Sequence, residues 1–164
     1  MKTAIIYHSE HHGNTKKLLD AIAKTGDVTL IDAADCISAD LSSFELIGFA
    51  SGIYYQKFHQ AVLDAAQQYL PQNKKVFFLY TCGIKRASYT NAIEEIVKAK
   101  GADILGSHAC LGYDTFGPFK LVGGIAKGHP NNEDIESVVC FFENIDKENC
   151  TYAERQTDYL PIVA

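Results

Sequence analysis

Two hydroxyl groups, an amide and a glycine lie close together near the start of the chain, at Ser9, Gly13, Asn14 and Thr15. They follow a short apolar run over residues 3–7 and precede an amphipathic segment, so a strand is expected to end where a helix begins. The first turn of such a helix has backbone N–H groups without intrahelical partners and carries partial positive charge, which together hold an anion. The segment therefore predicts a phosphate cradle, with an ordinary helix-capping connection as the alternative. The candidate residues are Ser9, His11, His12, Gly13, Asn14 and Thr15.

Metal and thiol chemistry find less support in the sequence. His11 and His12 are adjacent and point in different directions, and no third ligand is evident, so no metal site is predicted. The 5 cysteines are scattered without a C-x-x-C pair, which favours reduced thiols. Cys110 and Cys140 lie within apolar segments and are expected to be small core residues.

Length and charge narrow the function classes. A chain of 164 residues fits one domain with a sizeable core. Its net charge of −5 gives no broad basic field, so neither nucleic acid nor an anionic membrane is an expected partner. The start of the chain is too short for a signal-peptide core, and no apolar run reaches membrane-spanning length, so a soluble cytoplasmic protein is expected.

Apolar runs alternate with helical patterns along the chain. The expected strands cover residues 3–7, 28–31, 45–50, 75–80 and 104–111, and the expected helices carry apolar stripes within 18–23, 62–69, 93–97 and 135–142. Because such alternation requires right-handed crossovers, the pattern predicts an α/β fold with a parallel sheet covered by helices on both faces. Ligands of these sheets lie beyond the carboxyl ends of the strands, where the loops 8–15, 51–55 and 81–84 are expected to converge.

Two further segments are less regular. Residues 112–132 are rich in Gly and Pro and are expected to form a long functional loop. The tail 146–164 has no clear period; a surface-lying or flexible extension is expected, with docking on a partner subunit as the alternative.

Four motifs in order resemble those of the flavodoxin family. They are Ser9-Glu-His-His-Gly-Asn-Thr15, Ser51-Gly-Ile-Tyr54, Thr81-Cys-Gly83 and Gly124-Ile-Ala-Lys-Gly-His-Pro-Asn131. The resemblance covers about residues 2–145, which suggests a flavodoxin-like domain over 1–145 and a C-terminal extension over 146–164. It implies a three-layer, doubly wound fold with a five-stranded parallel sheet in the order 2-1-3-4-5.

The same resemblance implies the cofactor FMN, with the first loop on its phosphate. Around the isoalloxazine it places Ser51, Gly52, Ile53, Tyr54, Thr81, Cys82 and Gly83. It also implies that the Gly52 carbonyl accepts a hydrogen bond from the one-electron-reduced ring. The first loop departs from the usual pattern, because His11 and His12 stand where hydroxyl residues are common.

The expected function is that of a low-potential electron carrier between redox partner proteins, as a monomer or weak homodimer. The alternative is an FMN-dependent NAD(P)H oxidoreductase that acts on a quinone or another small molecule. Ile84-Lys85-Arg86 replaces the acidic cluster common in the third loop of the family, so partner docking is expected to differ from the usual mode.

Overall fold

Five apolar runs form the parallel strands of one sheet. In the computed structural model, which describes residues 1–10, 12–115 and 117–157, these are β1 (Thr3–His8), β2 (Val28–Asp32), β3 (Leu46–Tyr54), β5 (Lys75–Cys82) and β6 (Asp103–Leu111). Their order is β2-β1-β3-β5-β6. This confirms the predicted order 2-1-3-4-5 when the parallel strands alone are counted.

A short hairpin at the end of β3 differs from the prediction. Residues 51–54 were expected to form a loop, but β3 continues to Tyr54 and pairs antiparallel with β4 (Lys57–Phe58). The continuation has partners on both sides, since Gly52 lies opposite Thr81 and Ile53 lies opposite Phe58. The expected end of the strand near residue 50 is therefore wrong.

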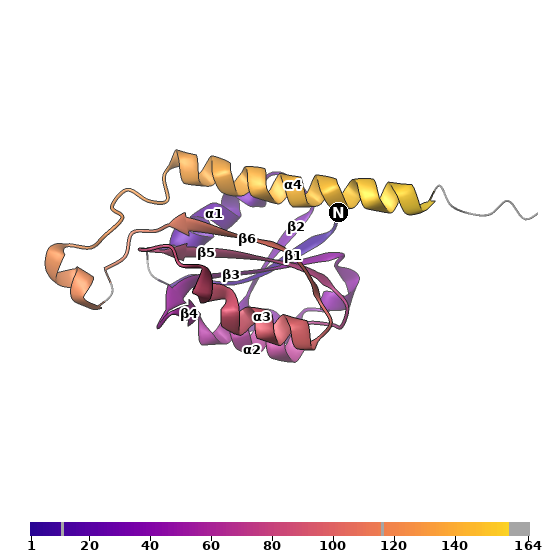
Figure 1. Ribbon diagram of the computed structural model, residues 1–164, viewed down its shortest axis with the longest axis horizontal. Coiled ribbons are helices and arrows are strands. Elements are labelled where there is room, and N and C mark those ends of the chain that lie inside the picture. Colours follow the sequence, from indigo (N-terminus) through magenta and orange to yellow (C-terminus); the bar gives the residue numbers. More distant parts are fainter. Residues whose placement is uncertain (11, 116, 158–164) are drawn as a thin grey trace, which may run out of the picture.

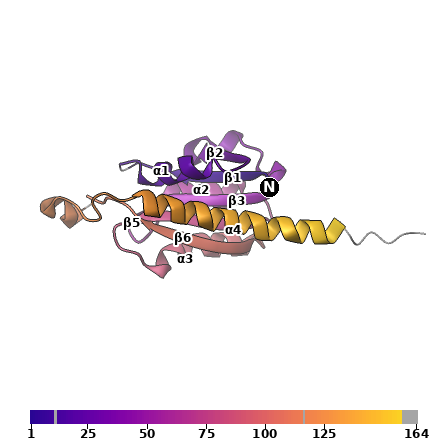
Figure 2. The ribbon, with the colours of Figure 1, turned by 90° about the horizontal axis from the view of Figure 1, so that it is seen from above.

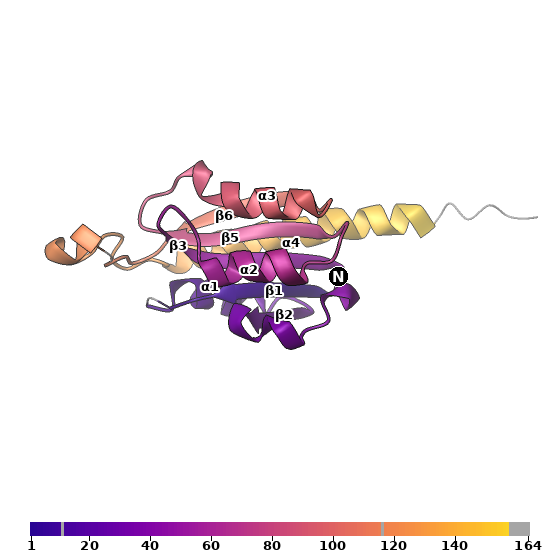
Figure 3. The ribbon, with the colours of Figure 1, turned by 90° about the horizontal axis from the view of Figure 1, so that it is seen from below.

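Helices cover both faces of the sheet (Figures 1, 2 and 3). One face carries α1 (Asn14–Ile22) and α4 (Asn132–Thr157), and the other carries α2 (Gln60–Tyr69) and α3 (Asn91–Ala99). Short 3-10 helices lie in the connections, at Ala33–Ser38, Leu41–Ser43, Ala87–Thr90 and Gly117–Val122. The last of these belongs to an arm that projects beyond the sheet in Figure 1.

Alternation along each strand divides the core into two clusters. On β5, Val76 and Phe78 pack with α2 and α3, whereas Phe77 and Leu79 pack with α1 and α4. Apolar residues on both faces are what a parallel strand covered by helices requires. Cys110 is buried as predicted. Cys140 was expected in the core but is exposed, because it lies on the outer face of α4.

The last helix is longer than its apolar stripe suggested. It runs for 26 residues, crosses the expected domain boundary at residue 145 without interruption and continues beyond the sheet in Figure 1. Ile145, at the boundary, is still part of the core. None of the helices in the described ranges is both long and apolar enough to span a bilayer.

Candidate functional site

The connection from β1 to α1 places backbone donors at the carboxyl end of the sheet. Gly13 caps α1 with a left-handed φ of 64°, which suits a residue without Cβ, and no side-chain hydrogen bond accompanies it. The Ser9 hydroxyl accepts the N–H of Lys16 at 3.2 Å. Within the described residues, the N–H groups of Asn14 and Thr15 have no acceptor. These two N–H groups lie at the start of α1, where the sequence predicts a phosphate cradle.

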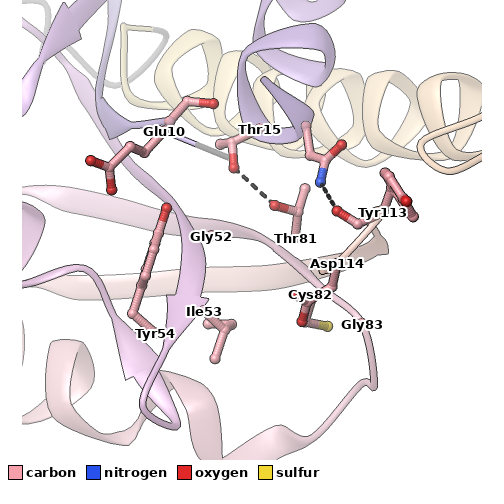
Figure 4. A pocket seen from close by; sticks show the side chains of 13 residues that line it. Glu10, Thr15, Gly52, Ile53, Tyr54, Thr81, Cys82, Gly83, Tyr113 and Asp114 are labelled. Atoms are coloured by element: carbon pink, nitrogen blue, oxygen red, sulfur yellow. Dashed lines mark hydrogen bonds between the residues drawn. The ribbon is translucent and has the colours of Figure 1, made fainter. Parts of the chain in front are cut away.

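Two hydrogen bonds fasten the start of α1 to the other strands (Figure 4). The hydroxyls of Thr15 and Thr81 lie 2.9 Å apart in a buried pair, which joins α1 to β5. The Asn14 amide donates to the Tyr113 carbonyl oxygen at 2.9 Å, which joins α1 to the chain beyond β6. These bonds hold three segments together around one groove, namely the start of α1, the end of β5 and the chain beyond β6.

The groove is lined by the segments that follow β1, end β3, end β5 and follow β6. Most residues predicted to bind a cofactor line it, namely Ser9, Asn14, Thr15, Gly52, Ile53, Tyr54, Thr81, Cys82 and Gly83. Figure 4 shows Tyr54 standing at one end and Tyr113 at the other, with Thr15 and Thr81 between them. The predicted convergence of three loops is therefore observed.

Three other predicted residues lie beside the groove rather than on its wall. His12 hydrogen bonds to the Thr115 hydroxyl at 3.1 Å, and Gly13 only caps α1. Ser51 is fully buried; its hydroxyl donates to the Gly52 carbonyl at 2.5 Å and accepts the N–H of His59 at 2.9 Å. His11 lies outside the described residues.

Four lining residues were not among the residues predicted to bind the cofactor: Glu10, Gly112, Tyr113 and Asp114. Glu10 lies inside the predicted cradle, but its negative charge gave no reason to place it beside a phosphate. Gly112, Tyr113 and Asp114 directly follow β6, whose carboxyl end lies at the same edge as that of β5. The strand order was the signal that could have added them to the site.

The thiol in the groove is held in its protonated form. Burial raises the pKa of Cys82 to about 11, so the nucleophilic thiolate is scarce at neutral pH. This agrees with a packing role for Cys82 beside a bound ligand.

A cluster of rings flanks the groove next to Tyr54. The imidazoles of His8 and His59 stack with their centroids 3.7 Å apart, and Tyr54 meets His59 edge-on at 4.9 Å. His8, Glu10 and His59 also offer ligand atoms within 4.8 Å of one another. However, Nδ1 of His59 accepts the N–H of Ala61 at 3.2 Å. The neutral ring then carries its hydrogen on Nε2, so Nε2 has no lone pair with which to bind a metal. We therefore assign no metal to this cluster.

Protonation of the ring cluster is expected to destabilise the fold. Burial, reinforced by the charge of His8, lowers the pKa of His59 below 6.5. The unfolded chain then binds more protons than the folded one as pH falls through 6.5, so the free energy of unfolding decreases with falling pH. His59→Asn keeps a capping side chain on α2 and removes the titrating ring. We expect urea unfolding between about pH 7 and pH 5 to show a shallower pH dependence for this variant.

His108 provides the comparison for that measurement. Burial also lowers its pKa, so it contributes with the same sign from the other side of the sheet. The dependence of unfolding free energy on pH that remains in His59→Asn should become still weaker when His108→Asn is added. If the double variant keeps the pH dependence of the wild type, the two histidines are not its source.

Comparison with known proteins places the chain in a family. The model of the "Flavodoxin domain" matches residues 4–107. The chain belongs to the flavodoxin family. An uncharacterised protein of Methanocaldococcus jannaschii is 37% identical over 150 residues, which cover 90% of this chain and 99% of that protein.

Solved flavodoxin structures share the fold at low sequence identity. Oxidised flavodoxin 2 from Bacillus cereus aligns with a TM-score of 0.63 at 18% identity, over 90% of this chain and 99% of that one. A flavoprotein from Lactobacillus acidophilus, solved in complex with FMN, aligns with a TM-score of 0.51 at 17% identity, over 66% of this chain and 92% of that one. The flavodoxin fold is thus shown by both sequence and structure.

Proposed function

We propose that the protein binds FMN in the groove and passes single electrons between redox partner proteins. The observation that carries this proposal is the Asn14 side chain. It is 8% exposed, lines the groove, and its Oδ1 has no hydrogen-bond partner among the described residues. An unsatisfied buried acceptor is costly, and a hydroxyl of the FMN ribityl chain is a suitable donor.

The start of α1 suits the phosphate of FMN. The free N–H groups and the positive end of the helix stabilise an anion without a buried cation. Gly112 allows the chain beyond β6 to approach, because a Cβ there would lie 2.8 Å from Nδ2 of Asn14. The residues therefore fit a phosphorylated ligand that enters from this edge.

The ends of β3 and β5 suit the isoalloxazine ring. Ile53 and Tyr54 supply apolar and aromatic surface, and Gly83 leaves room for the Ile125 side chain, since a Cβ there would lie 2.4 Å from Cδ1 of Ile125. FMN supplies the electron chemistry, and these residues orient it and exclude water. The Gly52 carbonyl already accepts the Ser51 hydroxyl, and a reduced flavin would use the second lone pair of that oxygen.

A second candidate function rests on an adjoining cavity. Beyond Ile53 and Gly83 the groove continues into a space lined by Tyr55, Arg86 and Phe119. A small acceptor there would lie next to the flavin ring, which favours the alternative of an NAD(P)H-dependent reductase acting on a quinone or another small molecule.

Reconstitution tests the proposal. The purified protein is expected to bind one FMN per chain and to quench the fluorescence of the flavin. Stepwise reduction with dithionite should then produce the absorbance of a one-electron-reduced flavin, while NADH and NADPH should leave the oxidised spectrum unchanged. Rapid bleaching by either nucleotide would favour the reductase, and a chain that stays colourless in excess FMN would refute both functions.

A further inference from the structure

A second groove continues from the flavin groove on the side of the phosphate. Its volume is about 530 Å³. The lining residues are His12, Asn14, Lys17, Tyr113, Lys127, Gly128, His129 and Pro130, and we call it the basic groove. Asn14 and Tyr113 line both grooves, so a ligand held in one can extend directly into the other.

The basic groove collects positive charge in an acidic protein. Although the net charge is −5, neither Asp nor Glu is found among the described residues that line this groove. Over the described ranges, Lys17 and Lys127 have no carboxylate partner, whereas Lys16 pairs with Asp20. Two ammonium groups are thus available to an anion at the surface of the groove.

Asp134, an acidic group close to the basic groove, is engaged at the start of α4. Asp134 bonds to Nδ1 of His129 at 2.5 Å and accepts the N–H of Asn131 at 2.9 Å. Its carboxylate therefore serves the start of α4 and pairs with neither lysine. Pro130 lies two residues before the first residue of α4, so the starts of both α1 and α4 adjoin the groove.

Asn14 lines both grooves, and its buried Oδ1 has no hydrogen-bond partner among the described residues. Asn14 is 8% exposed, and its amide nitrogen is fixed by the Tyr113 carbonyl, which leaves Oδ1 to accept from a ligand. A ligand that donates a hydrogen bond to this oxygen runs past the start of α1, and its phosphate end lies in the basic groove.

We infer that the basic groove binds the second phosphate and the adenosine of a flavin dinucleotide, FAD. This inference rests on the proposed flavin site, with the first phosphate of FAD at the start of α1. Lys17 and Lys127 then form charge-assisted hydrogen bonds to the second phosphate. Tyr113 and Pro130 offer flat surface to the purine.

The lining of the basic groove favours a nucleotide over a free anion, since it combines two lysines with the side chains of Tyr113 and Pro130. Continuity with the flavin groove also favours a covalently linked phosphate, because the linkage raises its local concentration.

Calorimetric titration of the full chain with FMN and FAD tests the inference. FAD is expected to bind with a dissociation constant at least about tenfold below that of FMN. In the double variant Lys17→Gln/Lys127→Gln the ratio of the two constants should fall to about threefold or less. Lys24→Gln is the matched control, since it removes one exposed lysine near the opposite end of α1 and should keep the wild-type ratio.

The outcomes separate this inference from the proposed function. FMN binding with equal or weaker FAD binding would overturn the inference and leave the flavin site intact. A preference for FAD that survives in the double variant would also overturn it, because the lysines would then play no part. Binding of neither flavin would refute the flavin site itself.

Discussion

Asn14→Asp is expected to weaken FMN binding by about 100-fold or more, which corresponds to roughly 2.7 kcal/mol. The substitution keeps the shape of the side chain but replaces a donor with a carboxylate oxygen that faces the Tyr113 carbonyl at 2.9 Å. A lost hydrogen bond of this kind costs about 1–3 kcal/mol, and repulsion between the new charge and the phosphate adds to it. Flavin fluorescence titration at fixed ionic strength measures the effect.

Asn91→Asp provides the control for that substitution. Asn91 is also the first residue of an α-helix, but it is exposed and does not line the groove. The same change of charge at the same helix position should therefore leave FMN affinity within about twofold of wild type. Equal weakening by both substitutions, or wild-type affinity in Asn14→Asp, would show that the phosphate does not lie at the start of α1.

Phe77→Ala is expected to lower the free energy of unfolding by about 3–5 kcal/mol. The Phe77 ring is fully buried on β5 and packs against Phe142 of α4 with ring centroids 5.8 Å apart. Its removal leaves a cavity between the sheet and α4. Urea unfolding monitored by circular dichroism measures the loss, and Leu121→Ala, at a side chain that is 90% exposed, should change stability by no more than about 0.5 kcal/mol.

The packing of the Phe77 ring can be tested a second time by a substitution at Gly48. A Cβ on Gly48 would lie 2.5 Å from Cζ of Phe77, so Gly48→Ala should destabilise the wild-type protein by roughly 1–3 kcal/mol. The clash disappears when Phe77 is already Ala, and the double variant should be more stable than the sum of the single effects predicts. Additive losses would mean that Gly48 is needed for a reason other than the Phe77 ring.

The sheet could be predicted because its sequence pattern is local and repeated. Apolar runs such as Val76–Tyr80 alternate with helical stripes, and the crossover rule then requires parallel strands. The hairpin of β3 and β4 gave no such signal. Its turn residues Tyr55 and Gln56 have φ values of 48° and 68°, yet neither is the Gly or Asn that usually marks this conformation.

The candidate site was predictable to the extent that its residues follow apolar runs. Ser9 and Thr81 could be found in this way, since each lies just beyond a run that was assigned to a strand, and Thr15 could be found because it lies where the next helix was expected to begin. The hydrogen bond from Asn14 to the Tyr113 carbonyl was missed, because no side-chain pattern reveals a backbone contact. The long course of α4 was missed because its apolar stripe ends near the edge of the sheet, although the helix continues to Thr157.

The groove joins parts of the chain that are far apart in sequence, from Ser9 to Asp114. Such long-range contacts form slowly, and this site is complete only when β6 has joined the sheet. Partly folded chains then lack the complete binding surface. A ligand that binds there shifts the equilibrium toward the folded state by mass action, so cofactor supply becomes a determinant of how much intact protein accumulates.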